Sequence, residues 1–80
     1  MWIYAIQSLQ DGRIYVGMTE DVHKRLIQHN QGKTKSTKGF IPWKLIYIEE
    51  TTDRISARKR ELFLKGGSGK EFLKKIAVNG

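Results

Sequence analysis

The pattern of apolar and polar residues predicts three strands. Side chains alternate along 2–7 as they do in a strand, and a second strand is expected at 13–17. Asp11-Gly12 between them predicts a hairpin turn, because glycine readily adopts a positive φ. A third strand is expected at 43–50, and its nearly continuous apolar centre predicts burial on both faces, in the middle of the sheet.

Residues that can cap a helix precede each of three segments with helical periodicity. Thr19 is expected to cap a helix that ends near Gln31, with Gly32 as its left-handed stop. The apolar stripe of this helix is expected to comprise Val22, Leu26 and Ile27.

Two further helices are expected after the third strand. Thr52 or Asp53 can cap the first of them, which runs to about Lys65 and stops at two glycines. A capping box that begins at Ser68 predicts a short last helix, whose apolar stripe is Phe72, Leu73, Ile76 and Ala77.

The expected order is therefore strand, strand, helix, strand, helix, helix. This order predicts an α/β (α+β) fold: a small, three-stranded, mainly antiparallel sheet flanked by helices, in a single domain that spans 1–80. The stretch 32–42, rich in Lys, Thr, Ser and Gly, is expected to form a mobile basic loop.

Composition narrows the class of partner. Fifteen Lys and Arg residues against eight Asp and Glu give a formal charge of +7, which is typical of proteins that bind polyanions and also of proteins with a basic, solubilising surface. The chain has no cysteine, so a disulfide framework or a thiolate zinc site is excluded. With no long apolar run and no basic leader, a cytoplasmic location is expected.

The candidate chemistry comes from five side chains spread along the sequence. Tyr4 and Tyr15 belong to the two hairpin strands and are expected to lie close together, because such strands are antiparallel neighbours. Arg25 and His29 are four residues apart on one helix, and Glu61 lies on the next. Phenol, guanidinium, imidazole and carboxylate together can activate water, hold a phosphate and bind a hard cation.

These residues resemble the motifs of the GIY-YIG nuclease superfamily, in particular its small stand-alone branch, which is similar to the nuclease domain of the bacterial excision-repair incision subunit. The resemblance covers nearly the whole chain, although Trp2 replaces the first glycine of the family name. The matching segments are Trp2-Ile3-Tyr4, Tyr15-Val16-Gly17, Arg25 with His29-Asn30, and Arg60-Glu61 with Leu64-Lys65. The stretch from Lys35-Ser36-Thr37-Lys38 through Pro42 to Tyr47 is also similar to the stand-alone branch.

The resemblance implies an endonuclease that hydrolyses DNA phosphodiester bonds with a divalent metal, Mg²⁺ or Mn²⁺, in DNA repair or recombination. It implies Glu61 as the metal ligand, Arg25 as the phosphate clamp and one of the two tyrosines as the group that helps to deprotonate water. We favour Tyr4 for this role, although the sequence does not decide between the two. Tyr15 would position water or phosphate, and His29 could take or relay a proton. The choice between DNA and RNA and the need for a protein partner that supplies specificity remain open.

Each of these residues also has an ordinary structural interpretation. Glu61 could be a solvated partner of Arg58 or Lys65, and its helix face, shared with Ala57, need not be buried. Arg25 could pair with Asp21, and either tyrosine could be ordinary strand packing. Three loop lysines could contact a nucleic-acid backbone or simply be solvated: Lys33, Lys35 and Lys38. The alternative function is a non-catalytic nucleic-acid-binding module.

Overall fold

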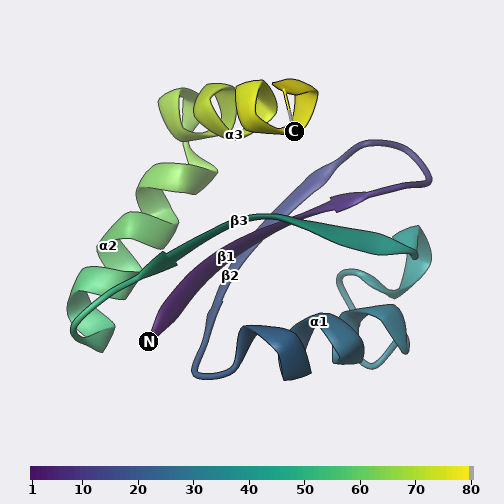
Figure 1. The fold of residues 1–80 in the computed structure, drawn as a ribbon, viewed down its shortest axis with the longest axis horizontal. Helices are drawn as coiled ribbons and strands as arrows, with labels where there is room; N and C mark the ends of the chain where they lie inside the picture. Colours follow the sequence, from purple (N-terminus) through teal and green to yellow (C-terminus); the bar gives the residue numbers. More distant parts are fainter. Residues whose placement is uncertain (80) are drawn as a thin grey trace.

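The computed structural model describes residues 1–79 and confirms the expected element order. Along this part of the chain the elements are β1 (Trp2–Ser8), β2 (Ile14–Thr19), α1 (Val22–Asn30), the short 3-10 helix η1 (Lys38–Phe40), β3 (Trp43–Glu50), α2 (Arg54–Lys65) and α3 (Gly67–Asn79). Figure 1 shows α1 on one side of the sheet and α2 and α3 on the other.

The strands form one antiparallel sheet in the order β2-β1-β3. The central strand is therefore β1, and the expectation that β3 lies in the middle is wrong. β1 is buried on both faces, whereas Leu45 and Ile48 of β3 are 37% and 47% exposed. An apolar run of four residues is equally compatible with an edge strand that packs one face on the core, so its composition alone does not fix its place in the sheet.

Alternate residues of β1 contribute to two separate cores. Ile3 and Ala5 pack with Val16 and with residues of α2 and α3, namely Ala57, Leu64 and Leu73. Tyr4 and Ile6 face the opposite side, where they form a second cluster with Trp43, against which Val22 and Leu26 of α1 pack. This confirms the predicted alternation of side chains in the first strand.

The helix ends agree with the sequence at the C-terminal side of α1 and at both ends of α2. Gly32 has a φ of 77°, as expected for a left-handed stop, and Asp53 caps α2 by accepting from the Ser56 N–H. The cap of α1 is Asp21 rather than Thr19, because the Asp21 carboxylate accepts from the Lys24 N–H. Ile27 is 55% exposed and does not belong to the apolar stripe.

The last helix begins earlier than expected. α3 starts at Gly67, so Ser68 lies in its first turn and the predicted capping box does not form. Leu73 is buried, and Ile76 and Ala77 are half-buried. Phe72 is 42% exposed, and its ring packs edge-on with the Tyr47 ring, with 5.4 Å between the ring centroids.

Gly69 allows the close approach of α2 and α3. A methyl group on Gly69 would lie 2.2 Å from the Phe63 carbonyl oxygen and 2.4 Å from the Leu64 Cα, both of which are backbone atoms. Nothing lies within 4 Å of the corresponding position at Gly67, two residues earlier in the same helix. The tight helix junction therefore requires glycine at 69 and not at 67.

We expect Gly69→Ala to lower the free energy of unfolding by about 1–3 kcal/mol, because the backbone of α2 has to move to admit the methyl group. The matched control is Gly67→Ala, which we expect to be neutral or to stabilise by up to about 1 kcal/mol, since alanine favours helix. Urea unfolding followed by circular dichroism measures both. Equal stabilities of the two variants would contradict the assignment of this close contact.

Candidate active site

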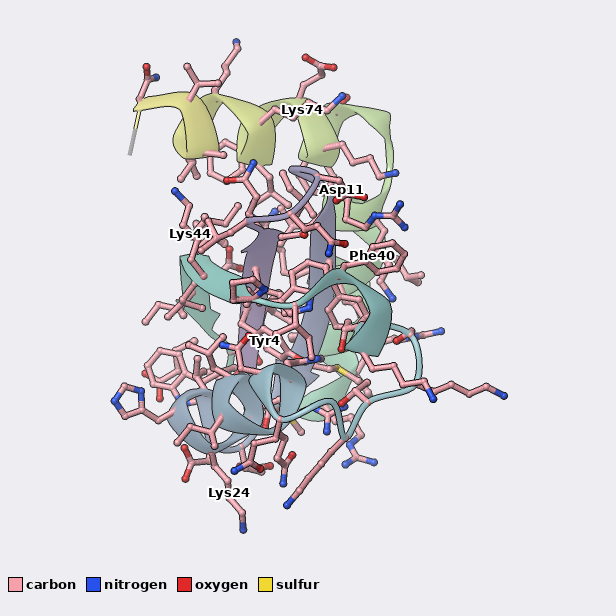
Figure 2. All side chains as sticks on the ribbon, turned by 90° about the vertical axis from the view of Figure 1, so that its right-hand side faces the viewer. Tyr4, Asp11, Lys24, Phe40, Lys44 and Lys74 are labelled. Atoms are coloured by element: carbon pink, nitrogen blue, oxygen red, sulfur yellow. The ribbon has the colours of Figure 1, made fainter. Side chains whose placement is uncertain are left out.

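A hydrogen bond between two buried polar side chains lies at the centre of the site. The Tyr4 hydroxyl and the His29 Nε2 are 2.7 Å apart, which joins β1 to α1. Tyr4 is 1% exposed and His29 is fully buried. Figure 2 shows Tyr4 in the interior, between the sheet and α1, whereas Lys24 on α1 points out to solvent. Because buried polar groups need partners, this pair constrains how α1 packs on the sheet.

Tyr15 and Gly17 of β2 complete the wall around the phenol. Tyr15 pairs with Ile6 in the register, diagonal to Tyr4, and its ring centroid lies 6.3 Å from that of Tyr4 and 5.1 Å from that of His29. Gly17 pairs directly with Tyr4, and a Cβ there would lie 2.6 Å from the Tyr4 hydroxyl oxygen. The Tyr4 ring therefore packs over the glycine of β2, the one position of that strand where no side chain would clash with it.

Burial shifts the pKa of both partners in the central hydrogen bond toward the neutral form. Burial raises the pKa of Tyr4 to about 12, with Arg25 opposing this shift and with smaller contributions from Tyr15 and Glu61 in the same direction as burial. Burial, and then the positive charge of Arg25, lower the pKa of His29 to about 4. At neutral pH the pair is therefore a protonated phenol and a neutral imidazole, and Tyr4 is a weak base unless a further cation approaches it.

Arg25 is half-buried beside this pair. Its guanidinium donates to the Gln28 side chain at 3.1 Å as well as interacting with Tyr4. Within residues 1–79 it forms no ion pair with Asp21, whose carboxylate caps α1 instead. Arg25 also lines a shallow polar pocket at the surface with Met18, Thr19, Glu20, Asp21, Lys24 and Gln28. The guanidinium thus connects the buried phenol with the surface.

Glu61 belongs to α2, a helix that also packs against β2. Its residue is only 6% exposed and shares the buried face of α2 with Ala57 and Leu64, so the expectation of an unburied face is wrong. The predicted partners are present: Arg58 donates to Glu61 at 2.7 Å and Lys65 at 3.3 Å. Their own side chains are about half exposed, so Glu61 is the desolvated member of this cluster.

A metal ion at this site would have a single carboxylate ligand from the chain. Among residues 1–79 there is no group of three or more His, Cys, Asp or Glu side chains that could hold a metal ion. Mg²⁺ usually keeps several waters and uses one or two carboxylates together with substrate phosphates. One buried carboxylate, with water and substrate phosphate as the remaining ligands, fits that coordination, whereas it does not fit a structural Zn²⁺ or Ca²⁺ site.

The loop lysines lie apart from these contacts. Lys33, Lys35 and Lys38 are all exposed, and none of them forms an ion pair with another residue of the described part of the chain, 1–79. The segment that carries them is nevertheless anchored, because Thr37 is fully buried and its hydroxyl lies 2.7 Å from the His29 Nδ1. The expectation of a uniformly mobile loop is therefore wrong at its centre.

Two residues of the site were missed from the sequence. Thr37 lies in a stretch that resembles the stand-alone branch, but nothing there indicates its burial, because a threonine among Lys, Ser and Gly is typical of a solvated loop. Asn30, quoted only as part of a motif, has a structural part: its amide donates to the Trp43 carbonyl at 3.0 Å and accepts from the Trp43 N–H at 2.7 Å. Asn30 thereby ties the end of α1 to the start of β3.

The order of strands and helices and the match to a family model define a nuclease-type domain. The model of the GIY-YIG catalytic domain matches residues 1–76, and the chain belongs to this family. No solved structure matches significantly. No helix within residues 1–79 is long and apolar enough to span a bilayer.

Similar small proteins occur in several bacteria. A UPF0213 protein of Staphylococcus epidermidis is 38% identical over 76 residues, which cover 94% of this chain and 92% of that protein. A UPF0213 protein of Staphylococcus saprophyticus is 38% identical over 77 residues, 95% and 93% of the two chains. One of Streptococcus pneumoniae is 37% identical over 65 residues, 80% and 65% of the two chains. These names give no activity.

The depressed pKa of His29 predicts how stability depends on pH. The folded-state pKa of about 4 lies below the ordinary value of 6.5, so the unfolded state binds the proton more tightly. The stability contribution is complete above the ordinary pKa and is lost as the pH falls toward about 4. We expect a loss of up to about 3 kcal/mol over this interval.

Urea unfolding at a series of pH values measures this slope. His29→Gln should flatten it, whereas His23→Gln, an exposed control on the same helix, should leave it unchanged. Carboxylates with lowered pKa values, Asp11, Glu49 and Asp53, contribute only at more acidic pH, near and below their ordinary pKa values. A wild-type stability that is flat from neutral pH to mildly acidic pH would contradict the burial of a neutral His29.

Proposed function

We propose that the chain is a metal-dependent endonuclease that hydrolyses DNA phosphodiester bonds. The observation that carries this proposal is the buried hydrogen bond of the Tyr4 phenol to His29 at 2.7 Å, with the Tyr15 ring beside both. Arg25 and Glu61, which belong to two different helices, both influence the pKa of that phenol. Membership of the GIY-YIG family supports a nuclease activity, and the formal charge of +7 supports a polyanionic substrate. A role in repair or recombination, a cytoplasmic location and a partner that supplies specificity stay predictions.

The proposed reaction divides the work among the five side chains. A water oxygen forms a bond to phosphorus while one ester P–O bond breaks, which gives a phosphate monoester and a hydroxyl. Tyr4 helps to take the proton of the water, with His29 hydrogen-bonded to the Tyr4 oxygen, and Tyr15 positions the water or the phosphate. Arg25 donates to the phosphate oxygens, whose negative charge increases in the transition state.

Glu61 is the residue proposed to hold the metal ion. Mg²⁺ or Mn²⁺ there would supply positive charge for the phosphate oxygens and for the proton loss of nearby groups. Arg58 and Lys65 now neutralise this carboxylate, and both are exposed enough to turn toward solvent or toward a phosphate. Tyr4, which is almost entirely protonated at neutral pH because its pKa is about 12, is the group that depends most on such a cation.

A non-catalytic nucleic-acid-binding module is the alternative, and one observation favours it. Glu61 already has two cationic partners, so its burial is explained without a metal ion. A binding module would use the same basic surface and would need no base near the phosphate. The two functions differ in what removal of the Glu61 charge does, because a binder gains or keeps affinity while a metal-dependent enzyme loses turnover.

The variant Glu61→Gln tests the two functions. We expect it to lower cleavage by a factor on the order of 10² or more, because a neutral amide holds a hard cation poorly. Cleavage is measured on duplex, nicked, branched and single-stranded DNA and on RNA, each with Mg²⁺, with Mn²⁺ and with a chelator. Glu71→Gln is the matched control: it removes the same charge from an exposed position on α3 and should leave cleavage unchanged.

Thermal melting of both variants separates loss of chemistry from loss of fold. Wild-type protein that binds DNA but cleaves none of these substrates with either metal would overturn the enzyme and favour the binding module. Cleavage that persists in Glu61→Gln would instead remove Glu61 as the metal ligand. RNA cleavage without DNA cleavage would keep the nuclease and change its substrate.

We also propose that the loop lysines contact the nucleic-acid backbone. Each phosphate that is neutralised on duplex DNA contributes roughly −0.9 to the slope of log affinity against log salt. Replacing Lys33, Lys35 and Lys38 by Gln should therefore make the slope less negative. Replacing three exposed lysines of α3, Lys70, Lys74 and Lys75, is the control with the same loss of charge. Equal slopes for the two triple variants would mean that the loop makes no specific backbone contact.

A further inference from the structure

Thr37 is a fully buried threonine within an otherwise polar and mostly exposed segment. Its backbone is held in place, since the Trp43 indole N–H donates to the Thr37 carbonyl at 2.9 Å. Its hydroxyl oxygen lies 2.7 Å from the His29 Nδ1, on the side of the imidazole opposite to Tyr4. The imidazole is thus held between two hydroxyl groups, each of which can either donate or accept.

The position of the hydroxyl proton of Thr37 decides which groups donate and which accept in the two hydrogen bonds of the His29 imidazole. The alternative acceptor is the Thr34 carbonyl oxygen at 3.4 Å, well beyond the 2.5–3.0 Å that is usual for such bonds. That carbonyl already accepts two backbone N–H groups, from Thr37 at 3.1 Å and from Lys38 at 3.0 Å. A carbonyl oxygen has two lone pairs, so the hydroxyl proton is better placed on the short contact to His29.

The direction of the hydrogen bond between His29 and Tyr4 follows from the position of that proton. His29 is neutral at neutral pH, because its pKa is lowered to about 4, so it carries one ring proton. If Nδ1 accepts from Thr37, that proton is on Nε2, which then donates to the Tyr4 oxygen at 2.7 Å. The positive charge of Arg25 also lowers the pKa of this phenol. A donor on the phenol oxygen together with that charge favours the ionised form of Tyr4.

We propose that Thr37 is a positioning residue whose hydroxyl holds His29 in the Nε2-protonated tautomer, so that the imidazole donates to Tyr4 rather than accepting from it. The importance of this tautomer for catalysis rests on the nuclease function proposed above, whereas the tautomer itself does not. With the opposite tautomer Tyr4 would donate to His29, and the imidazole would be the primary proton acceptor. The two arrangements therefore assign different bases.

Nuclear magnetic resonance of ¹⁵N-labelled protein distinguishes the tautomers directly. Long-range ¹H–¹⁵N correlations at neutral pH report which ring nitrogen of His29 is protonated, and exposed His23 in the same spectrum serves as the internal reference. We expect Nε2 protonation in the wild type and in Thr37→Ser, which retains the hydroxyl. Thr37→Val has nearly the same shape without it, and we expect a mixture or the Nδ1-protonated form.

An Nδ1-protonated His29 in the wild type would overturn the proposal, even if Thr37→Val failed to fold. An unchanged tautomer in folded Thr37→Val would do the same, because the hydroxyl would then not be what sets it. Neither result depends on nuclease activity.

Cleavage provides the second measurement. We expect Thr37→Val to lower kcat by roughly tenfold or more with KM little changed, and Thr37→Ser to restore it, because proton transfer contributes to the chemical step and not to binding. The expected tautomers without cleavage of any substrate would support the positioning role of Thr37 and count against the nuclease. Cleavage in which kcat of Thr37→Val equals that of the wild type would overturn the part of Thr37 in catalysis.

Discussion

The hydrogen bond between Tyr4 and His29 is the constraint on which the architecture of the site depends. It places two polar groups in the core of a domain of 80 residues, where each would be destabilising without the other. Its geometry requires that Gly17 carry no side chain and that Thr37 fold inward from its loop. A helix, two strands and a loop are therefore positioned around one contact, and the same contact places the candidate chemistry.

Charged side chains of opposite sign influence the Tyr4 phenol of this contact. Arg25 and Glu61 act on the Tyr4 phenol with opposite sign, and burial outweighs both. Glu61 is in turn balanced by Arg58 and Lys65, which reach it from more exposed positions on the same helix. The protein without substrate therefore holds its phenol neutral and its carboxylate paired. A phosphate that drew the two cations away, together with a metal ion, would change both conditions at once.

The sequence predicted local features of the fold well and their spatial arrangement less well. Alternation along β1 and the left-handed Gly32 follow from the backbone period and from a single φ, and both were predicted correctly. The place of β3 at the sheet edge depends on long-range pairing, and the start of α3 at Gly67 depends on packing against α2, which local signals do not contain.

The site shows the same division. The motif residues could be selected by their chemistry, but the burial of Glu61 and the inward position of Thr37 appear only when the chain is folded. Asp21 in place of Thr19 at the helix start shows how little separates two adjacent capping candidates. Sequence reasoning thus recovers which groups are present, whereas their desolvation, and with it their pKa, requires the structure.

The two cores on opposite faces of β1 divide the residues of this strand between two environments. Odd-numbered residues of this strand, Ile3 and Ala5, pack with α2 and α3, while even-numbered Tyr4 and Ile6 pack beneath α1 with His29 nearby. Mutagenesis confined to the odd positions would explore the stability of the helical layer without touching the phenol. Mutagenesis confined to the even positions would explore reactivity. Residues that support the helical layer and residues of the candidate site thus alternate along one short strand.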